Sequence, residues 1–223
     1  MLVRTPWIGR RDAIVGLATT VAATVVAAPL LPVPLSAKDR LLATPRQTEG
    51  PFYPREWQGD VDNDLVVVTG EAAQALGPVV HVEGRVLAMS GEPIAGATVE
   101  IWQCDANGIY RHPDDEGQGR RRDSGFQGRG RTVADADGRY RFRTIRPVAY
   151  GPRTPHIHFK VVPPAARPLI TQMYVFGEPL NARDGVLNAI ADRRQRDSVI
   201  VRLDRADRVE TGAMLASFDI VLA

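Results

Sequence analysis

The sequence has few of the residues that often carry a function by themselves. It contains a single cysteine, Cys104, and only four histidines among 223 residues. One cysteine excludes an intramolecular disulfide and a cysteine-based zinc cluster. Because Cys104 lies within an apolar, strand-like pattern, we expect it to be a buried packing residue rather than a nucleophile.

The sequence also lacks a strong excess of either charge, with 28 Lys and Arg against 26 Asp and Glu. This balance gives no indication of binding to nucleic acid. Glycine (20 residues) and proline (17 residues) are frequent instead. Such a composition favours a turn-rich β protein over a helical bundle, and the length fits one domain or at most two.

One long uncharged run lies near the N-terminus. Arg10 and Arg11 precede an Ala-, Val- and Leu-rich stretch over 13–35, and Leu35-Ser36-Ala37 is a small-residue cleavage site. The pattern predicts that residues 1–37 are a twin-arginine-type signal peptide, and the alternative is an uncleaved membrane anchor. Cleavage predicts an exported, periplasmic or extracellular protein without membrane contact. It removes three arginines and one aspartate and leaves 25 basic and 25 acidic residues.

The rest of the chain shows the two-residue period of β-strands. Residues 38–78 have no clear period and are predicted to form an extended, proline-containing segment around the domain. Further on, Val80, Val82 and Val86 alternate with polar residues, as in a half-buried strand. We predict that residues 79–223 form one mainly β domain, a Greek-key β-sandwich with long loops and one short helix.

The next apolar pattern predicts a strand with two distinct faces. Ala97, Val99 and Ile101 are expected on one face, with Trp102 and Cys104 on the other.

Turn and helix patterns complete the expected fold. Asp137-Gly138 is typical of a hairpin turn, and residues 186–194 are the one segment with a helical pattern. Further strands are expected at 139–143, 156–161, 170–175 and 214–222.

His156 and His158 are the clearest candidates for chemistry. Residues two apart in a strand point to the same face, so both imidazoles can reach one metal ion. No Asp or Glu lies within twelve residues of His156, so a 2-His-1-carboxylate site for Fe(II) would need a distant carboxylate. Tyr110 and Tyr150 are the other candidate donors, because a phenolate is a hard anion that favours Fe(III). Taken singly, a tyrosine is more often a packing residue.

Five stretches of the chain form a specific combination. They are TEGPFYP (48–54), GEPIAGATVEIWQCDANGIYRH (91–112), DADGRYRFRTIRP (135–147), PHIHF (155–159) and LITQMY (169–174). Together they resemble the intradiol ring-cleavage dioxygenases, and among these the β-chain type of the protocatechuate 3,4-dioxygenases. The resemblance runs through most of the chain that follows the predicted signal peptide.

The resemblance implies a reaction and a set of site residues. A catechol-type substrate would be cleaved by O2 to a cis,cis-muconate-type diacid. Tyr150 would take a catechol proton after leaving the metal, Arg153 would stabilise negative charge on the activated ring, and Gln172 would support the site by hydrogen bonding. The implied cofactor is a non-haem Fe(III) ion held by Tyr110, Tyr150, His156 and His158.

The segment between Tyr150 and His156 departs from the family pattern. Only Gly151 to Pro155 separate the two residues, where well-known members have a longer insertion with a tryptophan before the arginine. We therefore expect a more open pocket. The sequence shows neither the helical N-terminal region of the catechol 1,2-dioxygenases nor a second chain type, and a homo-oligomer is one arrangement that it allows.

Two other functions stay open at this point. Residues 91–99 and 135–142 also resemble transthyretin-like β-sandwich modules, which bind or pack without chemistry. Such a module would explain the strands and turns but not the co-occurrence of the candidate ligands with Arg153 and Gln172. An exported metal-binding oxygenase of other specificity would keep the metal and change the reaction.

Overall fold

The computed structural model describes residues 40–57, 59–115 and 121–223, all of which belong to one unit, Leu35–Ala223. The predicted signal peptide, residues 1–37, lies outside the described residues, so its cleavage and the export of the protein stay predictions. Within the described part of the chain, no helix is long and apolar enough to cross a membrane.

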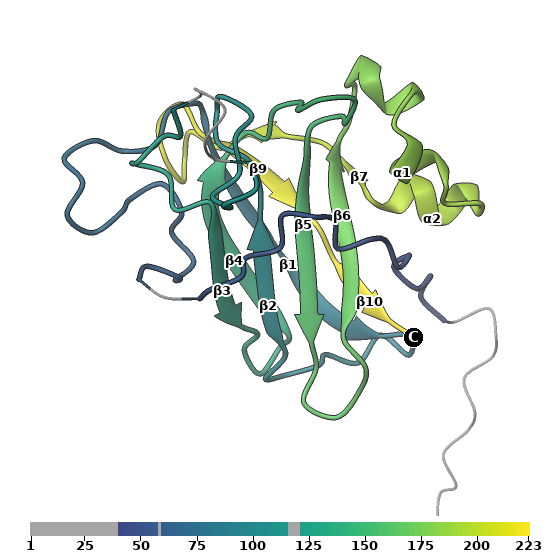
Figure 1. Cartoon of the computed structure of the whole chain (residues 1–223). Coiled ribbons are helices and arrows are strands. Elements are labelled where there is room, and N and C mark those ends of the chain that lie inside the picture. The colour runs from purple at the N-terminus through teal and green to yellow at the C-terminus, as the bar shows by residue number, and fades with distance from the viewer. Residues whose placement is uncertain (1–39, 58, 116–120) are drawn as a thin grey trace, which may run out of the picture. The chain divides into compact units, whose positions relative to one another are not determined.

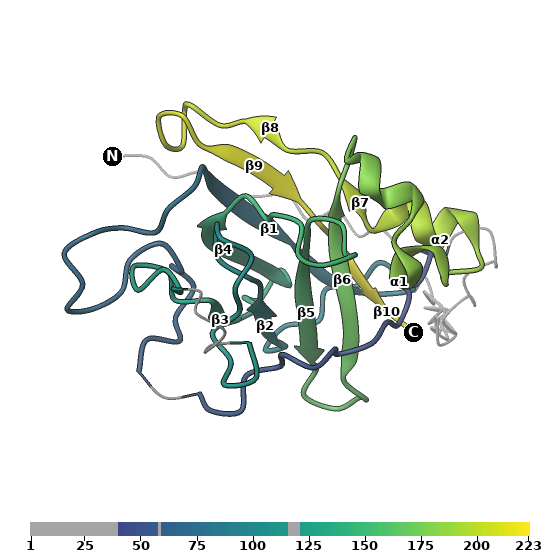
Figure 2. The same cartoon turned by 45° about the horizontal axis from the view of Figure 1, so that its top comes forward.

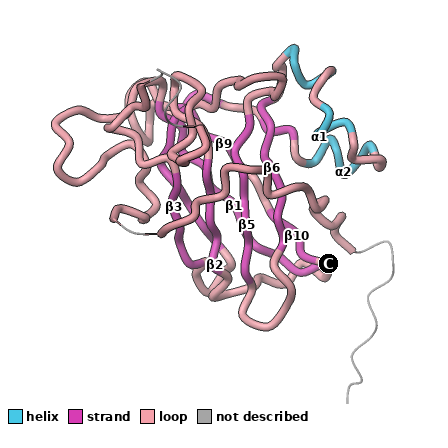
Figure 3. The backbone as a smooth tube through the Cα atoms, viewed as in Figure 1, coloured by secondary structure: helices cyan, strands magenta, loops and turns pink. Residues whose placement is uncertain are grey.

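The described residues form a mainly β structure, as predicted (Figures 1 and 3). The strands are β1 Val79–Ala88, β2 Thr98–Trp102, β3 Arg129–Val133, β4 Arg139–Ile145, β5 His156–Val162, β6 Leu169–Val175, β7 Ile200–Val201, β8 Asp204–Arg205, β9 Met214–Ser217 and β10 Ile220–Leu222. The short helices are the 3-10 helix η2 Pro179–Ala182, α1 Gly185–Asn188 and α2 Arg193–Ser198.

The strands form two five-stranded sheets that pack against each other (Figures 1 and 2). In the first sheet, β1 pairs antiparallel with β4 and parallel with β9 and β10, and β8 pairs with β9. The second sheet has the order β3-β2-β5-β6-β7. Its pairs are antiparallel except for β6 and β7, which are parallel.

The main core lies between the two sheets. Val80 of β1, Val99 and Ile101 of β2, and Phe159 of β5 have no exposed surface and belong to one apolar cluster. The Phe159 ring lies 5.2 Å from the ring of Phe218, which belongs to the connection between β9 and β10. Full burial of such a side chain contributes about 1.5–3 kcal/mol, so the alternating pattern seen in the sequence holds the sandwich together.

The second sheet is buried on its outer face as well. Trp102 and Cys104 lie opposite Ile101, as predicted, in a separate cluster with Tyr110. Phe52 and other partly buried residues from loops pack against this cluster, and Cys104 is a buried free thiol whose pKa burial raises to about 12. The outer face of the second sheet is therefore an enclosed apolar site rather than a solvated surface.

Gly84 of β1 allows the strands β9 and β10 to lie beside it. A Cβ atom at Gly84 would lie 1.9 Å from the carbonyl oxygen of Phe218. That oxygen accepts a hydrogen bond from the hydroxyl of Tyr140, and the Phe218 N–H donates to the carbonyl of Glu83 at 2.8 Å. The strand predicted over 214–222 is consequently divided into β9 and β10 at this point.

The prediction of a hairpin at Asp137-Gly138 is wrong, although the turn itself forms. Gly138 has a φ of +73°, and its N–H donates to the carbonyl of Asp135 at 3.0 Å. However, β3 pairs with β2, and β4 pairs with β1. The turn therefore passes the chain from one sheet to the other, because a turn signal is local and does not choose the partner of the next strand.

The prediction of a single helix at 186–194 is also wrong, because two short α-helices, α1 and α2, lie in this part of the described chain. Asp184 caps α1 and Asp192 caps α2, and each carboxylate accepts hydrogen bonds from two backbone N–H groups of the first turn. An aspartate in this position starts a new helix, so α2 begins inside the range predicted for one helix.

The extended N-terminal segment runs over both sheets. Its described residues up to 78 form neither a helix nor a strand, apart from an isolated bridge at Asp64. The Thr44 N–H donates to a carbonyl of β10, and the Gln47 N–H donates to a carbonyl of β6 (Figure 1). Leu65 is fully buried in the main core. The segment thus contacts both sheets, and Leu65 enters the core between them.

Replacing Gly84 by alanine is expected to destabilise the protein by about 1–3 kcal/mol, because the new Cβ would overlap the Phe218 carbonyl. Gly185→Ala is the control, since a Cβ there meets nothing within 4 Å, and its effect should stay within about 0.5 kcal/mol. Urea unfolding measures both variants. Equal stabilities would contradict the role given to Gly84.

Candidate metal centre

The four candidate ligands come from three separate segments of the chain. His156 and His158 are the first and third residues of β5, Tyr110 follows a turn after β2, and Tyr150 lies in the loop after β4. All four side chains lie at the outer face of the second sheet, where Tyr150 packs against the apolar cluster that contains Tyr110.

Asp105 builds the turn that presents Tyr110. Its Oδ1 accepts hydrogen bonds from two backbone N–H groups of the turn, one of them that of Ile109 at 3.0 Å. Gly108 has a φ of +74°, which favours glycine. The Tyr110 N–H then donates to Asp115 at 2.7 Å. The turn is therefore held on both sides of Gly108, and the backbone that carries Tyr110 is fixed.

Three of the donor atoms lie close together, and the Tyr150 side chain packs beside them. The Nε2 atoms of His156 and His158 are 3.2 Å apart, and the Tyr110 hydroxyl lies 3.5 Å from His156 Nε2. The Tyr150 ring lies 5.0 Å from the Tyr110 ring and 5.7 Å from the His156 ring, measured between centroids. The structure thus brings together all four side chains singled out in the sequence.

Neighbouring groups fix the two imidazoles. His156 Nδ1 donates to the carbonyl of Thr154 at 2.6 Å, and a carbonyl can only accept, so Nε2 carries the lone pair. Trp102 stacks on His158 with 4.7 Å between ring centroids and 12° between planes. Gly50 packs against the same ring, because a Cβ there would lie 3.3 Å from His158 Cε1. Both rings are therefore held with Nε2 toward the common point.

Burial determines the protonation of these groups in the metal-free protein. It raises the pKa of Tyr110 well above its ordinary value. It also raises the pKa of Tyr150, although the nearby Arg153 cation offsets part of this increase. Burial and the Arg153 cation lower the pKa of His156 to about 4. Burial and the neighbouring His156 lower the pKa of His158 well below its usual range. The site therefore holds neutral phenols and neutral imidazoles near pH 7.

The donor set fits a metal ion that binds oxygen and nitrogen. Two nitrogens that each lie about 2.1 Å from one ion are at most about 4.2 Å apart, and the 3.2 Å between the histidine Nε2 atoms satisfies this limit. No three His, Cys, Asp or Glu side chains in the described ranges gather to hold a metal. Binding would depend on the tyrosines, and a bound cation lowers the pKa of a phenol and offsets the burial of its anion.

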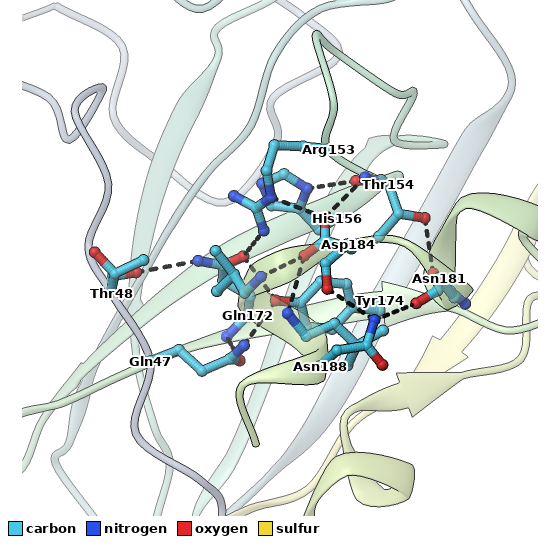
Figure 4. Close-up of polar contacts among 12 residues, drawn as sticks. Gln47, Thr48, Arg153, Thr154, His156, Gln172, Tyr174, Asn181, Asp184 and Asn188 are labelled. Carbon is cyan, nitrogen blue, oxygen red and sulfur yellow. Dashed lines mark hydrogen bonds and ion pairs between the residues drawn. The ribbon is translucent and has the colours of Figure 1, made fainter. Parts of the chain in front are cut away.

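Arg153 lies next to these donors and is held by two neighbours (Figure 4). Its Nε donates to Asp184 at 2.8 Å, and its Nη2 donates to Gln172 Oε1 at 2.6 Å. Gln172 Oε1 also accepts from the Tyr174 hydroxyl at 2.9 Å, while its Nε2 donates to the carbonyl of Thr48 at 3.1 Å. The Gln172 amide is thus held at both ends, and its oxygen holds the Arg153 side chain.

Sequence reasoning missed Asp184, which is fully buried beside Arg153. Burial alone would raise the pKa of Asp184, but hydrogen bonds from Arg153, Leu187 and Thr154 outweigh burial and lower it, so the carboxylate is charged. The only local signal is its position before a helical pattern, as expected of a helix cap. Its approach to Arg153 is a tertiary contact.

Sequence reasoning also gave no role to two aromatic residues that enclose the donors. Trp102 covers His158, and Phe52 stacks on Tyr110 with 4.8 Å between ring centroids. Both lie in stretches that carry the family resemblance, 48–54 and 91–112, which is the signal that could have found them.

Comparisons with known proteins identify the family of the chain. The sequence profile of a dioxygenase family matches residues 48–223. The chain belongs to the intradiol ring-cleavage dioxygenase family. It is 37% identical to the protocatechuate 3,4-dioxygenase beta chain of Burkholderia cepacia over 202 residues, which cover 87% of this chain and 82% of the relative.

Solved structures share the fold of this intradiol dioxygenase. The dioxygenase domain of a dioxygenase carbohydrate-binding protein fusion from Streptomyces sp. SirexAA-E has a TM-score of 0.61 at 30% identity, over 81% of this chain and 97% of that one. Catechol 1,2-dioxygenase from Acinetobacter sp. ADP1 has a TM-score of 0.63 at 28% identity, and the match covers 81% of this chain and 63% of that enzyme. The non-catalytic module considered from the sequence is therefore not supported.

The short segment after Tyr150 forms a tight turn in this intradiol dioxygenase. The Arg153 N–H donates to the carbonyl of Tyr150 at 2.9 Å, and the two residues form an isolated bridge. Gly151 and Pro152 between them are exposed, and Tyr150 is partly exposed. The turn leaves Tyr150 partly exposed, and the more open pocket expected from the sequence stays a prediction.

Lowering the pH from about 7 to about 4 is expected to destabilise the metal-free protein. The pKa of His156 is about 4 in the folded chain against 6.5 for a free histidine, so the unfolded chain binds more protons between these values. Stability is therefore lost as the pH falls through this window, and His156 alone contributes about 3 kcal/mol of the loss. Urea unfolding across this range is the measurement. His156→Gln should reduce the dependence and leave the part that His158 contributes, and identical slopes in both proteins would count against the assignment.

Proposed function

We propose that this dioxygenase cleaves a catechol-type aromatic between its two hydroxyl-bearing carbons, with O2 as oxidant and a non-haem ferric ion as cofactor. Both atoms of O2 enter the product, a cis,cis-muconate-type diacid. The observation that carries the proposal is the close packing of two phenols and two imidazoles at one site. Membership of the intradiol family supports the same reaction.

The proposed ion makes use of every donor at the site. When bound, it supplies a Lewis acid that draws electron density from the catechol and makes the ring reactive toward O2. Two tyrosine side chains bound as phenolates would offset two of its three positive charges. The residues that would hold it are Tyr110, Tyr150, His156 and His158.

Tyr150 is the donor best placed to take a proton from the substrate. Its side chain is partly exposed, whereas Tyr110 is 2% exposed and lies under Phe52. Burial also raises the pKa of Tyr150. A phenolate in this position regains its basicity once a cation no longer holds it, and it then accepts a catechol proton. Tyr110 is enclosed and would stay in place.

Arg153 is proposed to stabilise the negative charge that develops on the reacting ring. Asp184 holds its Nε and Gln172 holds its Nη2, so the guanidinium is oriented before the substrate arrives. A charge that is already oriented needs no reorganisation during the reaction, and such groups contribute about 2.7–4 kcal/mol in other enzymes.

The exposed turn after Tyr150 supports a substrate class of substituted catechols. Gly151 and Pro152 are exposed at the place where well-known family members carry a longer insertion, so a ring substituent would meet solvent rather than protein on this side. Related enzymes are named for protocatechuate and catechol, and both molecules carry the two adjacent hydroxyls that the proposed site needs.

Oxygen uptake with a panel of catechols tests the proposal. The iron-loaded protein is expected to consume one O2 for each catechol and to give a ring-opened diacid, because both oxygen atoms enter the product. Mass spectrometry after reaction in ¹⁸O2 identifies the product and its labelled oxygens. A hydroxylated aromatic, or a product cleaved beside rather than between the hydroxyl-bearing carbons, would contradict it.

The visible spectrum tests the ligands separately. Two tyrosinates on Fe(III) give a charge-transfer band, so the iron-loaded protein should be burgundy. Tyr110→Phe is expected to change or remove the band and to lower catechol cleavage by at least about 100-fold, the upper range for loss of a group that only supports a metal ligand.

Two controls bear on that result. Tyr140→Phe removes the hydroxyl of a phenol that is buried in the main core. His81→Ala removes an imidazole of the first sheet that pairs with Glu210. Both should keep the band. If Tyr110→Phe keeps the parent spectrum as well, Tyr110 is not a ligand.

A further inference from the structure

We propose that Asp184 is a positioning residue for this site, orienting Arg153 directly and His156 through the backbone of Thr154. The role rests on the function proposed above, because it matters only where Arg153 and His156 serve one metal-dependent reaction. Asp184 itself touches none of the four candidate metal ligands by a hydrogen bond that the described residues show.

The Asp184 carboxylate makes two pairs of hydrogen bonds in different directions. Oδ1 accepts from the N–H groups of Val186 and Leu187 at 3.0 and 2.9 Å, at the start of α1. Oδ2 accepts from Arg153 Nε at 2.8 Å and from the Thr154 N–H at 2.9 Å. One fully buried side chain thus joins α1 to the segment that leads into β5.

Thr154 transmits this constraint to the metal site (Figure 4). Its N–H is held by Asp184, and its carbonyl accepts from His156 Nδ1 at 2.6 Å. Its hydroxyl donates to Asn181 Oδ1 at 2.7 Å. The group that receives the Nδ1 proton of a metal-binding histidine sets the direction of the ring, so the position of Thr154 sets where His156 Nε2 points.

The other end of the linkage is anchored in the protein core. Leu187 of α1 is 1% exposed and belongs to the main apolar cluster. Asn188 Nδ2 donates to the carbonyls of Asn181 and Asp184 at 2.9 and 2.8 Å. These contacts make α1 and the residues before it a fixed support, against which Asp184 holds Arg153.

Helix capping alone does not account for this arrangement. Asp192 caps α2 in the same way, with one carboxylate oxygen accepting from the N–H groups of Arg194 and Gln195. It is exposed, however, and its hydrogen bonds are those of a cap. Asp184 differs from Asp192 by the two additional hydrogen bonds that its Oδ2 accepts. Asp192 is therefore a matched control for Asp184.

The test compares Asp184→Asn with Asp192→Asn in the iron-loaded full-length protein. Asparagine caps helices as well as aspartate does, so both variants keep their caps, whereas Asp184→Asn loses the charge that holds Arg153. Three quantities are measured: kcat and KM for unsubstituted catechol, the rate of iron loss to EDTA, and the melting temperature.

Asp184→Asn is expected to lower kcat by about 100-fold with a smaller change in KM. It should also lose iron about 10-fold faster, as for other groups that orient a metal ligand. Asp192→Asn should match the parent in both quantities. The iron-loss rate is a readout that does not depend on turnover.

Arg153→Gln and the double variant Arg153→Gln/Asp184→Asn separate the two routes and guard against misfolding. The double variant removes both charges of the buried pair, which is less disruptive than leaving one unpaired. If Asp184 acts on catalysis through Arg153, kcat of the double variant should equal that of Arg153→Gln. Its iron loss should stay fast, because that effect passes through Thr154.

The outcomes distinguish this proposal from the function on which it rests. A parent protein that binds iron and cleaves catechol, with Asp184→Asn behaving like Asp192→Asn, overturns the positioning role alone. The positioning role is also overturned if kcat of the double variant Arg153→Gln/Asp184→Asn is about 100-fold lower than kcat of Arg153→Gln. A parent protein that binds no ferric iron overturns both.

Discussion

The placement of β5 between β2 and β6 is the constraint on which the site depends. The pairing register sets His158 opposite Trp102 and Gln172, and His156 opposite Tyr174. Because side chains alternate along a strand, the residue between the two histidines points into the main core. A shift of the register by one residue would turn both imidazoles into the core, so the packing that stabilises the sandwich also specifies the site.

Enclosure of the donors gives the site its chemical character. Trp102, Phe52 and Gly50 exclude water from the imidazoles and from Tyr110. The same burial that keeps the histidines neutral raises the pKa values of the tyrosines. A phenolate in such surroundings is unfavourable without a nearby cation. The metal-free arrangement is therefore ready to release protons to solvent when a cation binds.

The two tyrosines differ because different loops present them. A turn held by Asp105 and Asp115 directs Tyr110 under Phe52, whereas the short segment after β4 leaves Tyr150 at the rim. This asymmetry separates an enclosed phenol from one that is partly open to solvent. It arises from loop length and local hydrogen bonds, while the strands supply only the platform.

Much of the platform could be predicted from the sequence, because alternation along a strand is a property of the local backbone. The two faces of β2, the histidine pair on β5 and the mainly β class all follow from that period. The turn at Asp137-Gly138 shows the limit of such reasoning. Its conformation is local, but the strands on either side pair with different sheets, and those partners are chosen by burial of apolar surface over long separations.

By itself, the sequence determined which side chains share a face and which residue types could bind a metal. Only the tertiary structure decided that Tyr110 and Tyr150 reach the histidines, and that Asp184 closes on Arg153. The reason is physical. A strand's period is set by its own backbone geometry, whereas a contact between distant segments exists only once the two sheets and the loops over them have packed.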